Sequence, residues 1–254
     1  MTNKLKYFVG NWKMFGDFKS YKIVNSMNKS YKNIGKKAKN NKIILCVPNI
    51  LISYFKKKMK NSNIILGAQN CSSYENYGPY TGSISAHMLK KAGAKYIILG
   101  HSENRMEGET PKLIKKKVFL TLKQNLNVIL CIGESSYEKK RGKTFSVLSK
   151  QIKNSIEKKI NFNKIIIAYE PIWSIGTGKV PKVNDLKKIF SFIKNYFKKS
   201  FKTKKSPVIL YGGSVNDKNI KTFSLISEID GFLVGGASQS AKKFIDIIKN
   251  YYKQ

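Results

Sequence analysis

The stretch Ile165-Ile166-Ile167-Ala168-Tyr169-Glu170-Pro171 decides the fold. Its β-branched run has the length of a buried strand, and it ends at a carboxylate followed by a helix-blocking proline. A Lys-rich segment then covers Val183–Phe201, with apolar residues at helical spacing opposite the lysines. A buried strand, a loop and an amphipathic helix in this order predict one βα unit.

The same unit recurs from one end of the chain to the other. Strands are predicted at Tyr7–Trp12, Ile43–Val47, Ile64–Gln69, Tyr96–Leu99, Val128–Ile132, Ile165–Tyr169, Val208–Tyr211 and Gly231–Val234. Eight strands is the number that a closed parallel barrel requires, and no segment has the Pro, Gly or Ser content of a linker. The sequence therefore predicts an α/β protein with one (β/α)8 barrel domain over residues 1–254, its parallel strands ringed by helices.

The formal net charge is +35, from 49 Lys and Arg residues against 14 Asp and Glu residues. Such a charge ordinarily suggests a nucleic acid or an anionic membrane as partner. Here the lysines are scattered and accompany abundant Asn, Ile, Tyr and Phe, whose codons are A/T-rich. Proteins that read nucleic acids tend to cluster basic residues on one face or arm. A base-composition bias is therefore the favoured explanation, and no specific nucleic-acid partner is predicted.

The cysteines and the chain start indicate the compartment. Cys46, Cys71 and Cys131 are odd in number and form no CxxC pattern, which argues against both a disulfide framework and a metal site. Met1–Tyr7 lacks the apolar core of a signal peptide, and no apolar run approaches the roughly 20 residues of a membrane span. A cytoplasmic protein without a membrane partner is predicted.

Polar residues follow the predicted strands, at the end of a barrel where active sites form. Asn11 and Lys13 follow the first strand, His101 the fourth and Glu170 the sixth. Glycine-rich turns follow the last three strands, at 176–179, 212–214 and 235–236. A carboxylate, an imidazole, an ammonium and several backbone amides are therefore expected to converge on one mouth.

Five segments resemble the signatures of the triosephosphate isomerase family, in that family's order and along the whole chain. They are Gly10–Met14 (GNWKM), Leu99–Glu103 (LGHSE), Ala168–Lys179 (AYEPIWSIGTGK), Tyr211–Val215 (YGGSV) and Asp230–Ser238 (DGFLVGGAS). Each is weak alone, but the joint match is specific. The resemblance implies an isomerase of glycolysis and gluconeogenesis that interconverts dihydroxyacetone phosphate and D-glyceraldehyde 3-phosphate through an enediolate, without a cofactor.

Moving a carbonyl between adjacent carbons requires a base over those carbons, and Glu170 is the acidic residue placed to act as one. His101 is the candidate donor to the carbonyl oxygen, where negative charge develops. The resemblance implies a neutral imidazole, kept so by a helix N-terminus. Either a helix over Gly108–Lys123 or a shorter turn after His101 can supply that N-terminus. The other histidine, His87, falls in a predicted helix.

Lys13 and Asn11 are predicted to hold the substrate and its oxyanion, and the resemblance implies that Glu103 orients Lys13. The phosphate has its own predicted site, because glycines let backbone amides approach an anion and a helix N-terminus is expected after the eighth strand. Its predicted ligands are Gly176, Ser214, Gly235 and Gly236.

A mobile lid is predicted to close over the site and exclude water. Its residues are Pro171, Ile172, Trp173, Ser174, Ile175, Gly176, Thr177, Gly178 and Lys179. Tyr211 and Ser214 resemble the pair that latches the closed lid in the family. The lid is followed by Val180-Pro181, where smaller or hydroxylated residues are common, so its kinetics are expected to differ.

The resemblance also implies a homodimer in which the loop Gln69–Gly82 reaches into the partner. Ser83 stands where a glutamate is customary, and Asn104 where an arginine usually follows His-Ser-Glu. We expect a dimer that lacks this ion pair and relies more on loop packing. Two rival interpretations are a sugar-phosphate epimerase on the same fold and a basic nucleic-acid-binding barrel without isomerase activity. The joint motifs argue against the first, and intact catalytic positions against the second.

Overall fold

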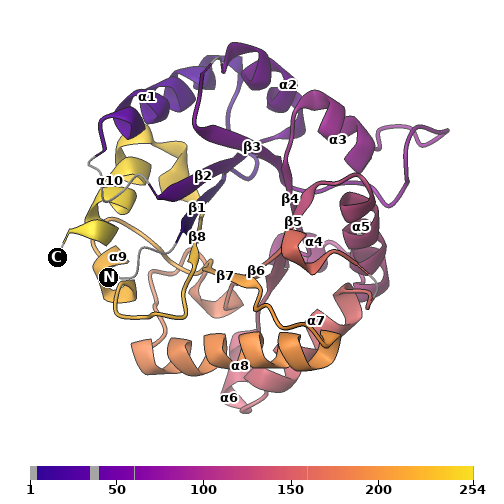
Figure 1. Ribbon diagram of the computed structural model, residues 1–254, viewed down its shortest axis with the longest axis vertical. Helices are drawn as coiled ribbons and strands as arrows, with labels where there is room; N and C mark the ends of the chain where they lie inside the picture. The colour runs from indigo at the N-terminus through magenta and orange to yellow at the C-terminus, as the bar shows by residue number, and fades with distance from the viewer. Residues whose placement is uncertain (1–4, 35–39, 60, 159, 254) are drawn as a thin grey trace.

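Eight parallel strands pair in chain order, and the last pairs with the first to close a barrel ringed by helices (Figure 1). The structure is a computed structural model that describes residues 5–34, 40–59, 61–158 and 160–253. The strands are β1 (Lys6–Asn11), β2 (Asn41–Cys46), β3 (Ile64–Ala68), β4 (Tyr96–Leu99), β5 (Asn127–Ile132), β6 (Ile165–Tyr169), β7 (Val208–Tyr211) and β8 (Gly231–Val234). The predicted (β/α)8 barrel is confirmed.

The helices lie outside the strands. They are α1 (Tyr21–Lys32), α2 (Asn49–Lys58), α3 (Ala86–Ala92), α4 (Ser102–Met106), α5 (Pro111–Lys123), α6 (Ser136–Lys140), α7 (Thr144–Ser155), α8 (Val183–Phe201), α9 (Ile220–Phe223) and α10 (Ala241–Tyr252). Short 3-10 helices add η1 (Phe18–Ser20), η3 (Phe162–Lys164), η4 (Ile172–Ser174) and η5 (Gly236–Gln239). Of the predicted domain 1–254, residues 1–4, 35–39, 60, 159 and 254 lie outside the described residues.

Small differences from the predicted boundaries have local causes. β1 begins at Lys6 and β2 at Asn41, because these two residues already pair in the parallel ladder. The helix expected over Gly108–Lys123 begins at Pro111 instead. The Thr110 side chain accepts a hydrogen bond from the backbone of Leu113, so Thr110 is the N-cap and the proline takes the first helical position.

Strand residues alternate between two apolar regions, as the period of two requires. Val9, Ile44 and Ile98 belong to the cluster inside the barrel, whereas Phe8, Ile43 and Ile97 belong to the cluster between the sheet and the helices. All six are buried. This double burial explains why the strands have continuous apolar runs, and it holds the strand ends rigidly around the mouth.

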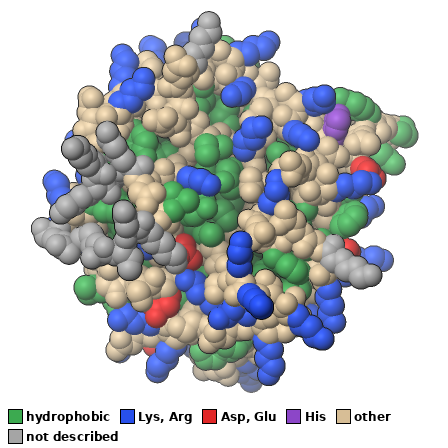
Figure 2. Space-filling view, viewed as in Figure 1, with side chains coloured by type: hydrophobic (Ala, Val, Ile, Leu, Met, Phe, Trp, Pro, Cys, Tyr) green, Lys and Arg blue, Asp and Glu red, His purple; other side chains and the backbone are tan. Residues whose placement is uncertain are grey.

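Lysine side chains are spread over the surface rather than gathered in one stripe. Figure 2 shows blue side chains around the whole rim of the visible face, with few red ones between them. This scatter is the pattern expected from compositional bias. Within the described part of the chain, no helix is both long enough and apolar enough to cross a membrane.

Candidate active site

The carboxylate of Glu170 and the imidazole of His101 face each other at the mouth of the barrel. Glu170 follows β6 and His101 follows β4, and Glu170 Oε1 lies 3.5 Å from His101 Nε2. Both residues are 4% exposed. The second oxygen, Glu170 Oε2, is buried and has no hydrogen-bond partner within the described residues. A buried carboxylate oxygen without a partner is costly to maintain, which is typical of a group reserved for a ligand.

Two glycines leave room for this carboxylate. A Cβ built on Gly212 would lie 2.5 Å from Glu170 Cγ, and one built on Gly133 would lie 1.9 Å from the carbonyl oxygen of Glu170. Neither position tolerates a side chain without displacing Glu170. The glycine turn after β7 therefore leaves space for the Glu170 side chain and also forms part of the cavity wall.

The ring of His101 begins the short helix α4. Its Nδ1 accepts the backbone N–H of Glu103 at 3.3 Å. Burial lowers the pKa of His101, whereas the carboxylates of Glu170 and Glu103 raise it above its ordinary value. The hydrogen bond from the Glu103 amide opposes this rise in pKa. Nδ1 can accept it only while the ring is neutral, because both nitrogens of an imidazolium carry hydrogens. Of the two predicted alternatives, the shorter turn directly after His101 meets the ring. This turn is the start of α4, and the longer helix is α5.

Lys13 adopts the left-handed backbone conformation, with φ of 55°. Its amide donates to Asn11 Oδ1 at 3.1 Å, and its carbonyl accepts from Gln69 Nε2 at 2.9 Å. Gln239 Nε2 donates to the carbonyl of Trp12, one residue earlier, at 3.0 Å. The Lys13 ammonium lies 2.6 Å from Glu103 Oε1. These contacts hold an unfavourable backbone conformation in place and aim the ammonium at the mouth.

Most predicted site residues line one cavity of about 160 Å³. They are Asn11, Lys13, His101, Glu170, Gly176, Ser214, Gly235 and Gly236. Glu103 instead lines an adjoining hollow of about 330 Å³ and reaches the site through Lys13 and His101. The cavity is smaller than the ~300 Å³ at which sites for drug-sized ligands begin, so it suits a molecule of few atoms.

The cavity lining combines two kinds of group. Glu170, His101 and Lys13 supply titratable side chains, and glycine turns supply backbone. A Cβ built on Gly235 or Gly236 would meet no protein atom within 4 Å. Both glycines therefore border free space, and Gly236 begins the short helix η5 immediately after β8. Such a backbone is suited to an anion.

The predicted lid segment is folded against the barrel rather than extended. Its first part forms η4, and Gly176 and Gly178 take positive φ values of 70° and 74°. Trp173 Nε1 donates to Glu134 Oε1 at 3.0 Å, and the Tyr169 hydroxyl lies 3.2 Å from both Glu134 oxygens. Burial raises the pKa of Glu134 despite these donors. The start of the lid is thus tied to the end of β5.

Sequence reasoning did not identify several supporting residues. Gln69 and Gln239 hold the loop after β1, and Glu134 holds the start of the predicted lid segment. Arg105 fixes the turn before His101, because its guanidinium donates to the carbonyls of Gly100 and Cys131. Their signals in the sequence are single polar residues near strand ends, which resemble ordinary surface positions.

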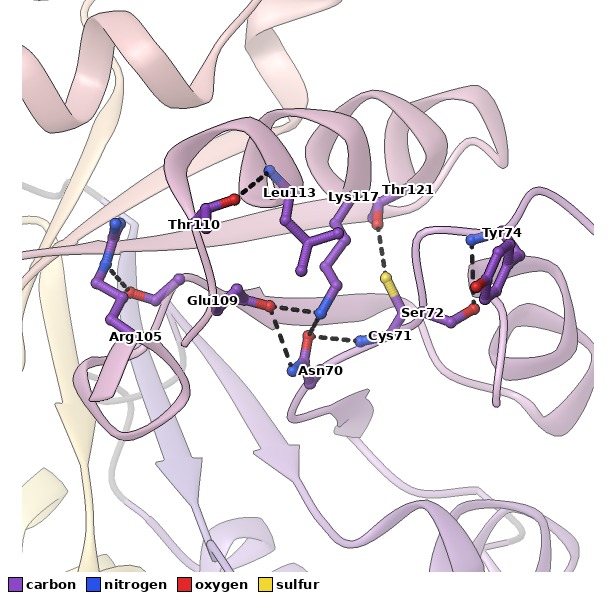
Figure 3. A network of polar contacts seen from close by, with 11 residues as sticks. Asn70, Cys71, Ser72, Tyr74, Arg105, Glu109, Thr110, Leu113, Lys117 and Thr121 are labelled. Atoms are coloured by element: carbon purple, nitrogen blue, oxygen red, sulfur yellow. Dashed lines mark hydrogen bonds and ion pairs between the residues drawn. The ribbon is translucent and has the colours of Figure 1, made fainter. Parts of the chain in front are cut away.

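A buried polar network holds the segment after β3 (Figure 3). The Lys117 ammonium pairs with the Glu109 carboxylate and donates to Asn70 Oδ1 at 3.1 Å. Asn70 Oδ1 also accepts the amide of Cys71 at 2.8 Å. Asn70 directly follows Gln69, so the network anchors the residue that supports Lys13. Among the described residues, no group of three or more His, Cys, Asp or Glu side chains is arranged to hold a metal ion.

Comparison with known proteins agrees with this geometry. A family model described as triosephosphate isomerase matches residues 6–251. The chain belongs to the triosephosphate isomerase family. The triosephosphate isomerase of Dictyoglomus thermophilum is 39% identical over 250 residues, covering 96% of this chain and 99% of the relative. That of Buchnera aphidicola is 41% identical over 251 residues, covering 97% of each chain.

A solved structure supports the same assignment. The crystal structure of triosephosphate isomerase from Bartonella henselae superposes with a TM-score of 0.87 at 34% identity, covering 98% of this chain and 99% of that one. The family match spans all the segments that carry the site. The chain is therefore an isomerase of the intramolecular aldose–ketose class, as its sequence predicts.

Proposed function

We propose that the protein interconverts dihydroxyacetone phosphate and D-glyceraldehyde 3-phosphate, as a step of glycolysis and gluconeogenesis. The observation that carries the proposal is the partnerless Glu170 Oε2, buried in the same small cavity as His101 and the glycine turns. A base, an electrophile and an anion cradle in one cavity meet the needs of a proton shift in a phosphorylated three-carbon substrate.

In this mechanism the Glu170 carboxylate removes the proton from the carbon next to the carbonyl, and the electron pair moves onto the carbonyl oxygen. His101 Nε2–H donates to that oxygen as charge develops, while the Lys13 ammonium stabilises it. Glu170 then returns the proton to the neighbouring carbon, and the one hydroxyl proton moves from its own oxygen to the former carbonyl oxygen, so that a new carbonyl forms where the hydroxyl was. No electrons enter or leave, so the residues of the chain are sufficient for the reaction.

The neutral state of His101 is part of this proposal. The N–H of Glu103 at Nδ1 supports a tautomer whose proton sits on Nε2, which faces Glu170 and the cavity. A neutral donor matches the basicity of an enediolate better than an imidazolium does. Asn11 contributes its amide to the same oxyanion, and Glu103 positions Lys13.

The phosphate is proposed to bind the amides of Gly176, Ser214, Gly235 and Gly236. Binding energy from this non-reacting group can then be used to close the lid and stabilise the transition state. Residues 171–179 act as the lid, with Ile175 and Gly176 already lining the cavity. Closure excludes water and prevents the enediolate from eliminating its phosphate.

A coupled assay with both triose phosphates, on the wild type and on Glu170→Asp, tests the proposal. Shortening the side chain by one methylene withdraws the base from the substrate carbons, and we expect kcat to fall by about 10²–10³-fold with little change in KM. A wild type inactive on both triose phosphates would refute the proposed function. Unchanged kcat in the variant would refute the role of Glu170.

We also propose a cytoplasmic homodimer. Figure 1 shows the segment between β3 and α3 extending beyond the ring of helices. In it the Tyr74 and Tyr80 rings stack at 3.4 Å, and Tyr77 is 71% exposed. Met14, beside Lys13, is fully exposed and lines the adjoining hollow. Exposed apolar groups beside a hollow suit a two-fold contact in which each loop enters the other subunit.

Charge restoration tests how this dimer is held. Asn104 lines the hollow, and Ser83 directly follows the loop Gln69–Gly82. If the missing ion pair limits association, Ser83→Glu combined with Asn104→Arg tightens the dimer in sedimentation over a dilution series. An unchanged dissociation constant would contradict that explanation. The rival nucleic-acid-binding barrel is not supported by the comparisons, and it would require steeply salt-dependent binding to nucleic acid.

A further inference from the structure

A second cavity, of about 290 Å³, lies between the start of the lid and the helices α7 and α8. α7 packs against both α6 and α8, and the three helices lie together on one side of the barrel (Figure 1). The residues that line this α7–α8 cavity are all different from those that line the catalytic cavity. It is therefore a separate space that the isomerisation itself does not require.

Apolar residues dominate the lining of the α7–α8 cavity. They are Phe145, Tyr169, Trp173, Pro181 and Ile189. Phe145 is 43% exposed, although its ring centroid lies 4.7 Å from that of Phe192, so part of the ring remains free for contact. The volume is close to the ~300 Å³ at which sites for small ligands begin, so the cavity suits one aromatic ring with a short substituent.

Positive charge borders the same space. Lys139 and Lys188 line the cavity, and no salt bridge in the described part of the chain involves either of them. α7 begins at Thr144, another lining residue, and its N-cap, Lys143, provides no side-chain cap. The amides of that first turn carry the positive end of the helix dipole. An anionic group is therefore the complement of this rim.

Two carboxylates also line the cavity, but each is stabilised locally. Glu134 is 1% exposed, its oxygens accept hydrogen bonds from Trp173 and Tyr169, and burial raises its pKa. Asp185 lies in the first turn of α8, where the helix N-terminus stabilises its charge. Lys188 has no such partner within the described residues, and the net charge of +35 adds to the preference for an anion over a cation.

The cavity touches both ends of the predicted lid. Trp173 lies in η4 near the start of the lid, and Pro181 follows its last residue, Lys179, by two positions. Tyr169, also in the lining, directly precedes the candidate base Glu170. A ligand that contacts Trp173 and Pro181 together resists any rearrangement that moves one against the other.

We propose that the α7–α8 cavity is a regulatory site for a small aromatic carboxylate, whose binding holds the lid and slows turnover. The ring packs against Phe145 and Trp173, and the carboxylate lies near Lys188 and the start of α7. Binding is independent of the isomerisation, whereas slower turnover rests on the proposed function, because it requires a lid that moves in each cycle. The ligand lies outside the catalytic cavity, so it lowers kcat without raising KM.

Fluorine NMR of three matched ligands tests the site on the wild-type protein. They are para-fluorophenylacetate, para-fluorophenylacetamide and para-fluorophenethylammonium, which share the ring and differ in charge. We expect the carboxylate to bind at least about tenfold more tightly than either analogue, because only the carboxylate gains a charge-assisted contact. Its affinity should stay the same when 2-phosphoglycolate saturates the catalytic cavity. Equal binding of the three ligands, or displacement by 2-phosphoglycolate, overturns the proposal.

Two lining residues with exposed side chains test the location. Lys188→Met and Phe145→Ala should each weaken binding of the carboxylate by about five- to tenfold. The controls are Lys199→Met, at an exposed lysine of the same helix, and Phe119→Ala, at a 39% exposed phenylalanine of α5. Neither control residue lines the cavity, so both variants should bind as the wild type does. Wild-type affinity in either lining variant, or an equal loss in its control, overturns the site.

Steady-state assays with saturating para-fluorophenylacetate test the regulation. We expect kcat of the wild type to fall by about threefold or more with KM unchanged, while Lys188→Met keeps its kcat at the same ligand concentration. An unchanged kcat in the wild type, or a rise in KM alone, overturns the regulatory role. A wild type that binds the carboxylate but lacks isomerase activity overturns the proposed function instead. An active isomerase that does not bind the carboxylate overturns the site alone.

Discussion

The ammonium of Lys13 lies 2.6 Å from Glu103 Oε1, which joins the loop after β1 to the first turn of α4. Lys13 reaches this position with a left-handed backbone that non-glycine residues seldom adopt. Asn11 and Gln69 hold that conformation from either side through hydrogen bonds to the Lys13 backbone. Strain of this kind, supported on both sides, is typical of a functional side chain.

Replacing Lys13 with methionine tests its role in binding. We expect KM to rise at least about tenfold, because a charge-assisted contact to an anionic substrate is lost. Lys13→Arg should not restore KM, since a planar guanidinium cannot occupy the place of a compact ammonium. Lys29→Met, at an exposed site on α1, removes the same charge and should leave steady-state kinetics unchanged. A KM equal to that of the wild type in Lys13→Met would contradict the assignment.

The start of the lid is held by a cation–π contact. Lys139 Nζ lies 3.4 Å from the centroid of the Trp173 ring. Lys139→Met should loosen the indole and shift its fluorescence to longer wavelength, while Lys139→Arg retains the wild-type spectrum. The chain has two tryptophans, and the other, Trp12, is completely buried, so the change reports Trp173. Lys140→Met on the same helix is the control, and an equal shift there would refute the contact.

The protonation of His101 can be read by nitrogen NMR of the imidazole. At pH 8 we expect Nδ1 to be unprotonated and Nε2 to carry the hydrogen, because Nδ1 accepts the Glu103 amide. Glu103→Gln should lower the pKa of His101, since the Glu103 carboxylate is one of the groups that raise it. The protonated ring then appears only at lower pH than in the wild type. A proton on Nδ1, or a rise in pKa, would contradict this electrostatic account.

The proposed phosphate site can be blocked without disturbing the fold. Gly236→Ala adds a methyl group that meets no protein atom within 4 Å, so thermal unfolding should be unchanged. If the phosphate occupies that space, KM should rise about tenfold while kcat changes less. Inorganic phosphate should lose its competitive inhibition in parallel. Wild-type KM in a stable variant would place the phosphate elsewhere.

The barrel was predictable because the spacing of apolar residues along the sequence shows where the strands and the helices lie. Ile165–Tyr169 and Val183–Phe201 are found in the structure with the bounds that periodicity predicts. The candidate base and donor were predictable for a related reason. In a parallel barrel the strand ends converge, so residues that directly follow β4 and β6 must face one mouth.

The supporting contacts were not predictable, because they depend on side-chain directions in three dimensions. Gln69 and Gln239 lie far apart in sequence but donate to carbonyls of adjacent residues in the loop after β1. Ser174 appeared only as one residue of a lid, although its hydroxyl has three partners in two segments. Nor does sequence show which helix meets His101, because α4 has only five residues.

A crystal structure with 2-phosphoglycolate tests the central claim most directly, since its carboxylate mimics the enediolate beside a phosphate. We expect the phosphate to lie among the amides of Gly176, Ser214, Gly235 and Gly236. The carboxylate should lie between His101 Nε2 and Lys13 Nζ, with Glu170 in contact with its carbons. A phosphate bound outside this cavity, or a Glu170 too far to touch the bound carbons, would contradict the account.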